Sequence, residues 1–215
     1  KNVDFLPLLK RALEAGYQSV MIDGSRLPLA QNIAVTQQAA ELAAKYGSAV
    51  EAELGAVAGH EGAGIGLSYE ELFTSKKGFT KTEEAAQFAR ESGCDWLSVA
   101  AGSFHGAIAA ATKHLKKPEA RLDIAHIAEL SAATGHMPLV LHGGSGIKQE
   151  YILRAMENGI AKINVATEIR QPYEFALEEK PGNITYAQQK VYDRTRWVLH
   201  DFLHTTNNHD TLKGD

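Results

Sequence analysis

The sequence predicts an α/β fold in which parallel strands alternate with helices. Short apolar runs alternate with longer amphipathic stretches along the chain, which is typical of repeated βα units. The chain has 215 residues, of which 44% are hydrophobic, and this is enough to bury a core without covalent cross-links. We therefore expect one domain over residues 1–215, with βα units in 1–170 and C-terminal helices and a tail in 171–215.

Composition also limits the class of partner. The 22 Lys and Arg residues against 26 Asp and Glu give a formal net charge of −4, which offers no basic footprint for nucleic acid. No apolar run approaches the ~18 residues needed to cross a bilayer. The single cysteine, Cys94, excludes an intrachain disulfide and favours a reducing compartment. We expect a cytoplasmic protein that binds neither nucleic acid nor membrane.

Local patterns predict the elements in order. Apolar residues near helical spacing predict a first helix over 5–15, with Gly16 closing it as a C-cap. Strands are expected at the apolar runs 19–22, 49–54, 96–100, 138–141 and 161–165. Helices are expected between them at 29–46, 82–91, 122–134 and 149–158, with further helical stretches after residue 165 that break at 181–183.

Polar and glycine residues gather where the predicted strands end. They include Asp23 and Glu53 and the segments 103–106, 142–146 and 164–168. A (βα)8 TIM barrel builds its active site at this end of its strands and commonly holds phosphate after strands 7 and 8. The segments after the last two strands fit that phosphate pair, so the five strands become strands 4–8 of a TIM barrel.

The barrel interpretation implies more chain than the sequence contains. A barrel typically needs about 250 residues, so roughly 80 residues with the N-terminal strands are expected upstream of Lys1. The chain would then be the C-terminal portion of a longer protein. An open, doubly wound sheet is the alternative architecture.

Two histidines and a glutamate indicate a metal site. His105 and His142 stand at the ends of neighbouring strands, each followed by glycine, and imidazole is a preferred zinc ligand. Glu53 shares a strand face with Glu51, and a carboxylate facing inward needs a cation or a donor. The alternatives are ordinary loop histidines and a Glu53 paired with Lys or Arg.

Two further segments predict a phosphate site of backbone amides and hydroxyls. Its candidate residues are Gly143, Gly144, Ser145, Asn164, Val165, Ala166 and Thr167. No lysine stands where a Schiff-base enzyme needs one, because Lys162 falls near the start of its predicted strand, at the opposite end from the site. This favours a metal as the electron sink.

Five segments taken in order resemble the class II (zinc-dependent) fructose- and tagatose-bisphosphate aldolases. They are residues 19–25 (SVMIDGS), 51–55 (EAELG), 105–106 (HG), 141–146 (LHGGSG) and 162–168 (KINVATE). The resemblance implies a (βα)8 barrel that cleaves a ketose 1,6-bisphosphate to dihydroxyacetone phosphate and glyceraldehyde 3-phosphate. It also implies a homodimer or homotetramer.

The resemblance assigns roles to individual residues. His105 and His142 look like two of three zinc ligands, and Glu53 like the carboxylate that zinc approaches in an alternative position. Glu61 matches the loop acid that transfers a proton at the dihydroxyacetone carbon. The phosphate contacts are carried over to Gly106 and to the segments 143–145 and 164–167, with a monovalent cation, Na⁺ or K⁺, near the phosphate.

The sequence also departs from the family pattern. The third zinc histidine and the catalytic aspartate of the family lie just before the point that matches Lys1, so both are expected upstream. Arg26 stands where the family commonly has His, and the segments 73–80 and 107–121 are longer than usual. The sugar therefore stays open between fructose, tagatose and another phosphorylated or sulfonated ketose. A non-catalytic phosphosugar-binding barrel is the remaining alternative.

Overall fold

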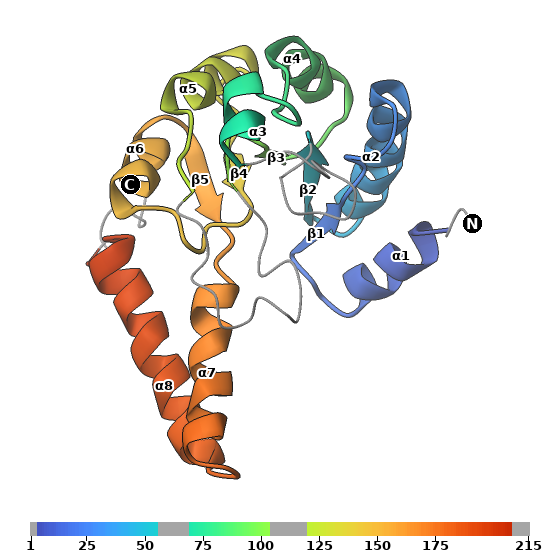
Figure 1. Cartoon of the computed structure of the whole chain (residues 1–215). Helices are drawn as coiled ribbons and strands as arrows, with labels where there is room; N and C mark the ends of the chain where they lie inside the picture. Colours follow the sequence, from blue (N-terminus) through green and yellow to red (C-terminus); the bar gives the residue numbers. More distant parts are fainter. Residues whose placement is uncertain (1–3, 56–68, 104–119, 208–215) are drawn as a thin grey trace.

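A computed structural model describes residues 4–55, 69–103 and 120–207 of the chain. Its centre is a five-stranded parallel sheet whose strands follow one another in chain order (Figure 1). The strands are β1 (Ser19–Ile22), β2 (Ala49–Leu54), β3 (Trp96–Val99), β4 (Leu139–Leu141) and β5 (Ile160–Ile163). An α/β fold with a parallel sheet is thus confirmed.

Helices lie on the outside of the sheet, and all but the first of them connect successive strands. They are α1 (Leu6–Glu14), α2 (Leu29–Ala44), α3 (Tyr69–Ser75), α4 (Thr82–Glu91), α5 (Ile124–Ala133) and α6 (Gln149–Glu157). Because the strand order never reverses, right-handed crossovers place the connecting helices on one face, as in a barrel. The doubly wound alternative, which needs a reversal of strand order, is wrong.

The predicted elements are all present, with small differences at their ends. The last strand begins at Ile160 and ends at Ile163, where the sequence predicted 161–165. Helix α3 was not predicted. Its seven residues are too few to show a clear helical period, and it follows a glycine-rich stretch.

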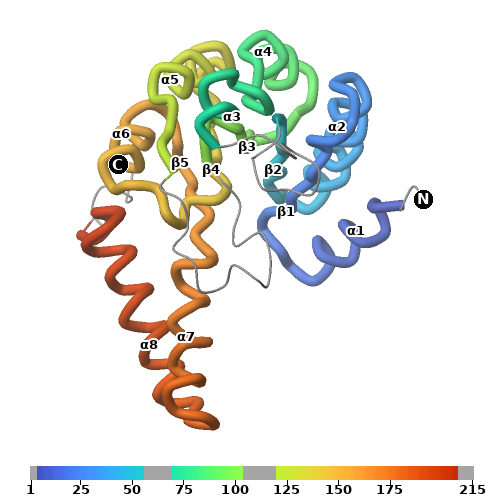
Figure 2. Tube along the Cα trace, in the orientation of Figure 1, coloured from blue at the N-terminus to red at the C-terminus, as the bar shows by residue number. Residues whose placement is uncertain are grey.

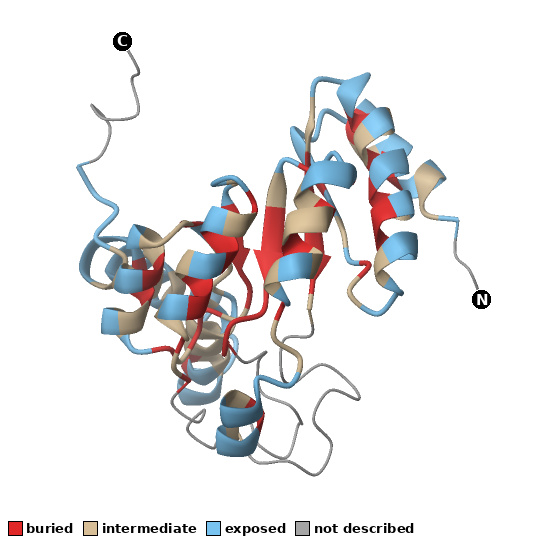
Figure 3. Cartoon of the chain, turned by 90° about the horizontal axis from the view of Figure 1, so that it is seen from above, coloured by how far each residue is buried: buried red, intermediate tan, exposed pale blue. Residues whose placement is uncertain are grey.

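The core lies between the sheet and the surrounding helices, where Figure 3 shows the buried residues concentrated. The outward-facing side chains of the strands pack against apolar helix residues such as Ile33, Phe88, Ile127 and Ile152. In β2 every residue after Ala49 is buried, and these include two carboxylates. Acidic side chains are almost never fully buried without partners, so this strand marks the chemical centre of the sheet.

Thr80 joins the ends of β2 and β3. Its buried hydroxyl donates to the carbonyl of Leu54 and accepts from the amide of Ala100, with 2.8 Å between Oγ1 and N. Its own amide donates to the carbonyl of Ala100 at 3.0 Å. Gly55 has a φ of +94°, and a Cβ there would lie 2.5 Å from Thr80 Oγ1. The close approach therefore requires glycine at position 55.

Two further helices, α7 (Thr167–Glu179) and α8 (Ile184–Trp197), form a hairpin that extends away from the sheet (Figure 2). The predicted break at 181–183 is confirmed, and the Asn183 side chain caps α8 by accepting from the amide of Tyr186. A short π-helix, Val198–Phe202, continues α8. Among the described residues, no helix combines the length and the apolar composition that a bilayer crossing requires.

Removing the Thr80 hydroxyl should destabilise the sheet. Thr80→Val keeps the shape but leaves the Leu54 carbonyl and the Ala100 amide without their partner, which should lower the free energy of unfolding by about 2–4 kcal/mol. Thr80→Ser keeps the hydroxyl and loses one methyl, so it should cost about 1 kcal/mol. Urea unfolding followed by circular dichroism compares the two variants. A valine variant as stable as the serine variant would contradict the role of this hydroxyl.

Candidate active site

The candidate site lies at the carboxyl ends of β2 and β4. Alternation along β2 places Glu51 and Glu53 on one face, and Glu53 pairs in register with Ser98 of β3. His142 directly follows β4. The side chains of Glu51, Glu53 and His142 are 3%, 3% and 6% exposed, so all three are withdrawn from water.

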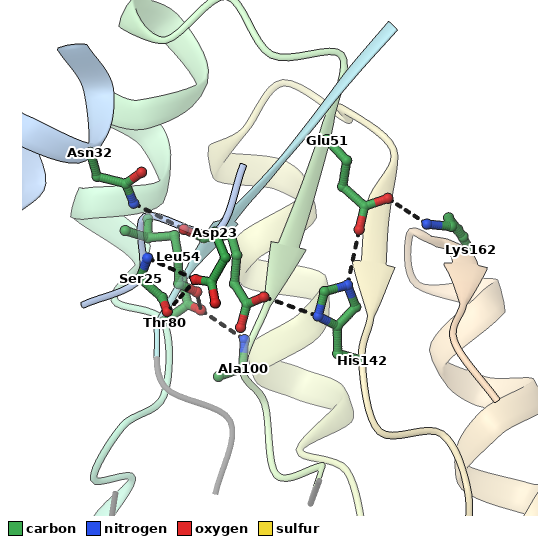
Figure 4. A network of polar contacts seen from close by, with 10 residues as sticks. Asp23, Ser25, Asn32, Glu51, Leu54, Thr80, Ala100, His142 and Lys162 are labelled. Carbon is green, nitrogen blue, oxygen red and sulfur yellow. Dashed lines mark hydrogen bonds and ion pairs between the residues drawn. The ribbon is translucent and has the colours of Figure 1, made fainter. Parts of the chain in front are cut away.

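The imidazole of His142 lies between the two carboxylates. Its Nε2 lies 2.9 Å from Glu51 Oε1, and its Nδ1 lies 3.0 Å from Glu53 Oε2. Lys162 of β5 places its Nζ 2.5 Å from the other oxygen of Glu51. Figure 4 shows Glu51 between His142 and Lys162. Side chains from β2, from the end of β4 and from β5 thus form one cluster of polar contacts, in which Glu51, Glu53 and His142 are buried and Lys162 is partly exposed.

In this cluster of side chains, charge pairing changes the pKa values more than burial does. Burial alone would lower the pKa of His142, but hydrogen bonds to Glu51 and Glu53 and their negative charges raise that pKa to about 9. Burial alone would raise the pKa of Glu51, and hydrogen bonds and charge from His142 and Lys162 bring it below the ordinary value. In the protein without metal, the site therefore holds an imidazolium between carboxylates.

The donor set at Glu53 fits a zinc ion. Glu53 Oε1 is buried and has no hydrogen-bond partner among the described residues, and such an atom calls for a cation or donor. Imidazole nitrogen and carboxylate oxygen are both zinc ligands. Within residues 4–55, 69–103 and 120–207, no group of three or more His, Cys, Asp or Glu side chains is arranged to hold a metal. His142 and Glu53 would therefore be part of a ligand set.

The two predicted phosphate segments lie against each other. The amide of Gly144 donates to the carbonyl of Asn164 at 3.1 Å, and the amide of Glu168 donates to Ser145 Oγ at 3.2 Å. A Cβ on Gly144 would lie 2.6 Å from Cγ2 of Ile163, so only glycine allows this approach. Thr167 begins α7, and the amides of a helix N-terminus favour an anion. The arrangement suits a phosphate group chemically.

The structure brings together most of the predicted site residues that it describes. His142 and Glu53 are in contact, and the segments 143–145 and 164–167 meet. His105, Gly106 and Glu61 lie outside the described residues.

The predicted position of Lys162 is wrong. Lys162 is the third residue of a four-residue strand and contacts the site through Glu51, rather than lying at the opposite end of the sheet. The sequence left open that Glu53 pairs with a Lys or Arg instead of a metal. In the structure the lysine pairs with Glu51, while Glu53 contacts His142. Sequence reasoning noted Glu51 only for its strand face. The signal that could have identified Glu51 as a site residue was its position two residues before Glu53, which places both side chains on one face of the strand.

The fold and site together define a class of protein: a parallel α/β barrel segment with an acidic and imidazole cluster where its strands end. A family model described as "Fructose-bisphosphate aldolase class-II" matches residues 4–208. The chain belongs to this family.

Relatives agree with this assignment. The chain is 33% identical over 191 residues to a fructose-bisphosphate aldolase of Streptococcus pneumoniae and 34% identical over 193 residues to one of Streptococcus pyogenes. Each match covers 86% of this chain and 59% of the relative. The chain thus spans about three fifths of the length of these relatives.

Solved structures share the fold. The YdjI aldolase of Escherichia coli K12 superposes with a TM-score of 0.73 at 29% identity, covering 92% of this chain and 65% of that one. A putative fructose-1,6-biphosphate aldolase of Coccidioides immitis superposes with a TM-score of 0.75 at 24% identity, covering 95% and 70%. The five-stranded sheet is therefore similar to part of the fold of these proteins.

The imidazolium of His142 should make the stability of the metal-free protein depend on pH. Its pKa is about 9 when folded against 6.5 for the free side chain, so this stabilisation is complete below pH 6.5 and is lost as pH rises through 9. We expect a decrease of up to about 3 kcal/mol in the free energy of unfolding across that window. Urea unfolding in EDTA over the same pH range measures it. His142→Gln should flatten the dependence, and an equal slope in both proteins would contradict the interpretation.

Proposed function

We propose that the full-length protein cleaves a ketose 1,6-bisphosphate to dihydroxyacetone phosphate and glyceraldehyde 3-phosphate, with zinc as the metal. The observation that carries the proposal is the buried contact of Glu53 with His142, which leaves Glu53 Oε1 without a partner among the described residues. Family membership over residues 4–208 supports the reaction class. Fructose 1,6-bisphosphate is the first substrate to test, because the named relatives are fructose-bisphosphate aldolases.

His142 and Glu53 would hold the zinc ion together with His105 and a histidine upstream of Lys1. When bound, zinc supplies a Lewis acid that stabilises the negative charge developing on the ketose oxygens as the C3–C4 bond breaks. Glu61 would donate the proton to the dihydroxyacetone carbon, and an aspartate upstream of Lys1 would exchange the proton of the C4 hydroxyl. The enclosure of His142 and Glu53 excludes water from the metal side of the site.

The two phosphate segments would orient the substrate. Ser145 contacts the first turn of α7 through the amide of Glu168, and the segments 143–145 and 164–167 meet beside it, which supports binding of the dihydroxyacetone phosphate group there. Gly106 would add a further amide, and a monovalent cation would balance the phosphate charge. A fixed phosphate holds the reacting carbons in one orientation, which turns remote binding energy into rate.

We also propose that β1 to β5 are strands 4–8 of the complete barrel. Support comes from the sequential strand order and from the 59% of the relatives' length that the chain covers. Homodimer or homotetramer formation stays a prediction. Tagatose bisphosphate is an alternative substrate for the same reaction, and another phosphorylated or sulfonated ketose would undergo the same class of reaction, a metal-dependent aldol cleavage.

Metal removal distinguishes the proposed chemistry from Schiff-base chemistry. Dialysis of the full-length protein against EDTA should abolish cleavage of fructose 1,6-bisphosphate, and Zn²⁺ should restore it, since the site offers imidazole and carboxylate ligands. A Schiff-base enzyme would instead keep its rate and be trapped on a lysine by borohydride in the presence of substrate. An undiminished rate after verified metal removal would overturn the zinc proposal. A protein that binds the sugar in a chelator-sensitive manner but does not cleave it would indicate the alternative function, a non-catalytic phosphosugar-binding barrel.

Ser145 tests the phosphate site separately. Ser145→Ala removes a hydroxyl that would donate to the phosphate, and a hydrogen bond to a charged group contributes about 1.5–3 kcal/mol. Dihydroxyacetone phosphate should bind roughly 10- to 100-fold more weakly by calorimetry, with zinc content unchanged. Ser48→Ala is a matched control, because Ser48 lies just before β2, at the other end of the sheet. Equal affinity in both variants would place the phosphate elsewhere.

A further inference from the structure

We propose that Glu51 and Lys162 are positioning residues that orient His142, so that its Nε2 faces Glu51 and its Nδ1 faces the metal on the Glu53 side. The inference rests on the proposed function, because it concerns the zinc site named there. It assigns a role to two residues that lie behind that site and would not contact the substrate. The evidence is the inequivalence of the two sides of the imidazole ring.

On one side of the ring, the hydrogen-bonding capacity is already used. Glu51 Oε1 lies 2.9 Å from His142 Nε2, and Glu51 Oε2 lies 2.5 Å from Lys162 Nζ. Both carboxylate oxygens of Glu51 therefore have a partner. A cation placed here would compete with an ammonium group that already neutralises the carboxylate.

On the other side of the ring, one oxygen remains available. Glu53 Oε2 lies 3.0 Å from His142 Nδ1, while its Oε1 is buried without a partner among the described residues. This is the side where a cation would satisfy a buried acceptor. Metal-binding histidines commonly donate their second ring N–H to a carboxylate, which fixes both the tautomer and the ring orientation. Glu51 is placed to accept from Nε2, which leaves the Nδ1 lone pair for the metal.

An irregularity in the sheet brings Lys162 to this position. Leu139 pairs with Ile160, but Val140 pairs with Lys162, so one residue of β5 is skipped between them. In a regular ladder, Val140 would pair with Ala161, and Lys162 would point to the opposite face. The bulge thus turns Lys162 to the face that carries Glu51 and Glu53, where its ammonium also lies 5.8 Å from the ring of Trp96.

The ion pair fixes the orientation of Glu51. The Glu51 side chain is 3% exposed, and its Oε2 lies 2.5 Å from Lys162 Nζ, while its Oε1 lies 2.9 Å from His142 Nε2. The ammonium group thus holds the carboxylate in the orientation that presents Oε1 to Nε2 of the imidazole ring. Lys162 therefore acts on the metal through Glu51 and His142, and not by contact.

The test is the zinc affinity of the full-length protein, measured by competition with a fluorescent chelator. Lys162→Met and Glu51→Gln should each weaken zinc binding by about 10- to 100-fold, the range for residues behind a metal ligand. The double variant should bind zinc only slightly more weakly than whichever single variant has the lower zinc affinity. Both substitutions interrupt the same series of contacts from Lys162 through Glu51 to His142, so their effects should not add. Lys76→Met is the matched control. It removes an equivalent ion pair, 2.8 Å between Lys76 Nζ and Asp123 Oδ2, away from His142, and should leave the affinity unchanged.

The tautomer of His142 gives a second measurement that does not depend on activity. In the zinc-loaded wild-type protein, ¹⁵N spectra of the histidine side chains should show His142 protonated at Nε2 and metal-bound at Nδ1. Glu51→Gln and Lys162→Met should reduce that signal, and Lys76→Met should not.

Two results would overturn the inference: wild-type zinc affinity in both Glu51→Gln and Lys162→Met, or metal bound at Nε2 in the wild-type protein. Failure of the wild-type protein to bind zinc at all would instead overturn the proposed function, so the two failures are distinguishable.

Discussion

The structure depends on the burial of two carboxylates on the inner face of β2. Removing a carboxylate from water is costly unless charge and hydrogen bonds replace the lost hydration. For Glu51 and Glu53 that replacement comes from His142, which follows β4, and from Lys162 in β5. The pairing of β2 with β3, β3 with β4 and β4 with β5 is therefore also an electrostatic requirement. A shift of β4 or β5 by one residue would turn their charged partners to the other face.

The backbone around Glu53 is fixed from two sides. Asn32, fully buried in α2, donates its side-chain amide to the carbonyl of Glu53 at 2.9 Å. The Thr80 hydroxyl donates to the next carbonyl along, that of Leu54. Gly24 belongs to the same arrangement, because a Cβ there would lie 2.0 Å from Asn32 Oδ1. The strand end that carries the candidate metal ligand is thus held by buried side chains of an outer helix and of the segment before α4, which limits the movement of the carboxylate.

Much of this arrangement could be predicted from the sequence, because it depends on local patterns. Apolar runs located five strands, and the carboxyl ends of parallel strands meet at one edge, which brought Glu53 and His142 together. The role of Lys162 could not be predicted in this way. It depends on the bulge between Leu139 and Val140, and a bulge is a property of the pairing of two strands rather than of either sequence. The short helix α3 was missed because seven residues carry too little periodicity.

The C-terminal hairpin also contributes to the electrostatics of the candidate phosphate site. Glu168 lies in the first turn of α7, and its amide donates to Ser145 Oγ. A carboxylate in that position would repel a phosphate dianion bound at the same helix end. Arg194 of α8 forms an ion pair with this carboxylate, which reduces the repulsion. The packing of α8 against α7 therefore does more than extend the fold, because it offsets a negative charge close to where an anion would bind.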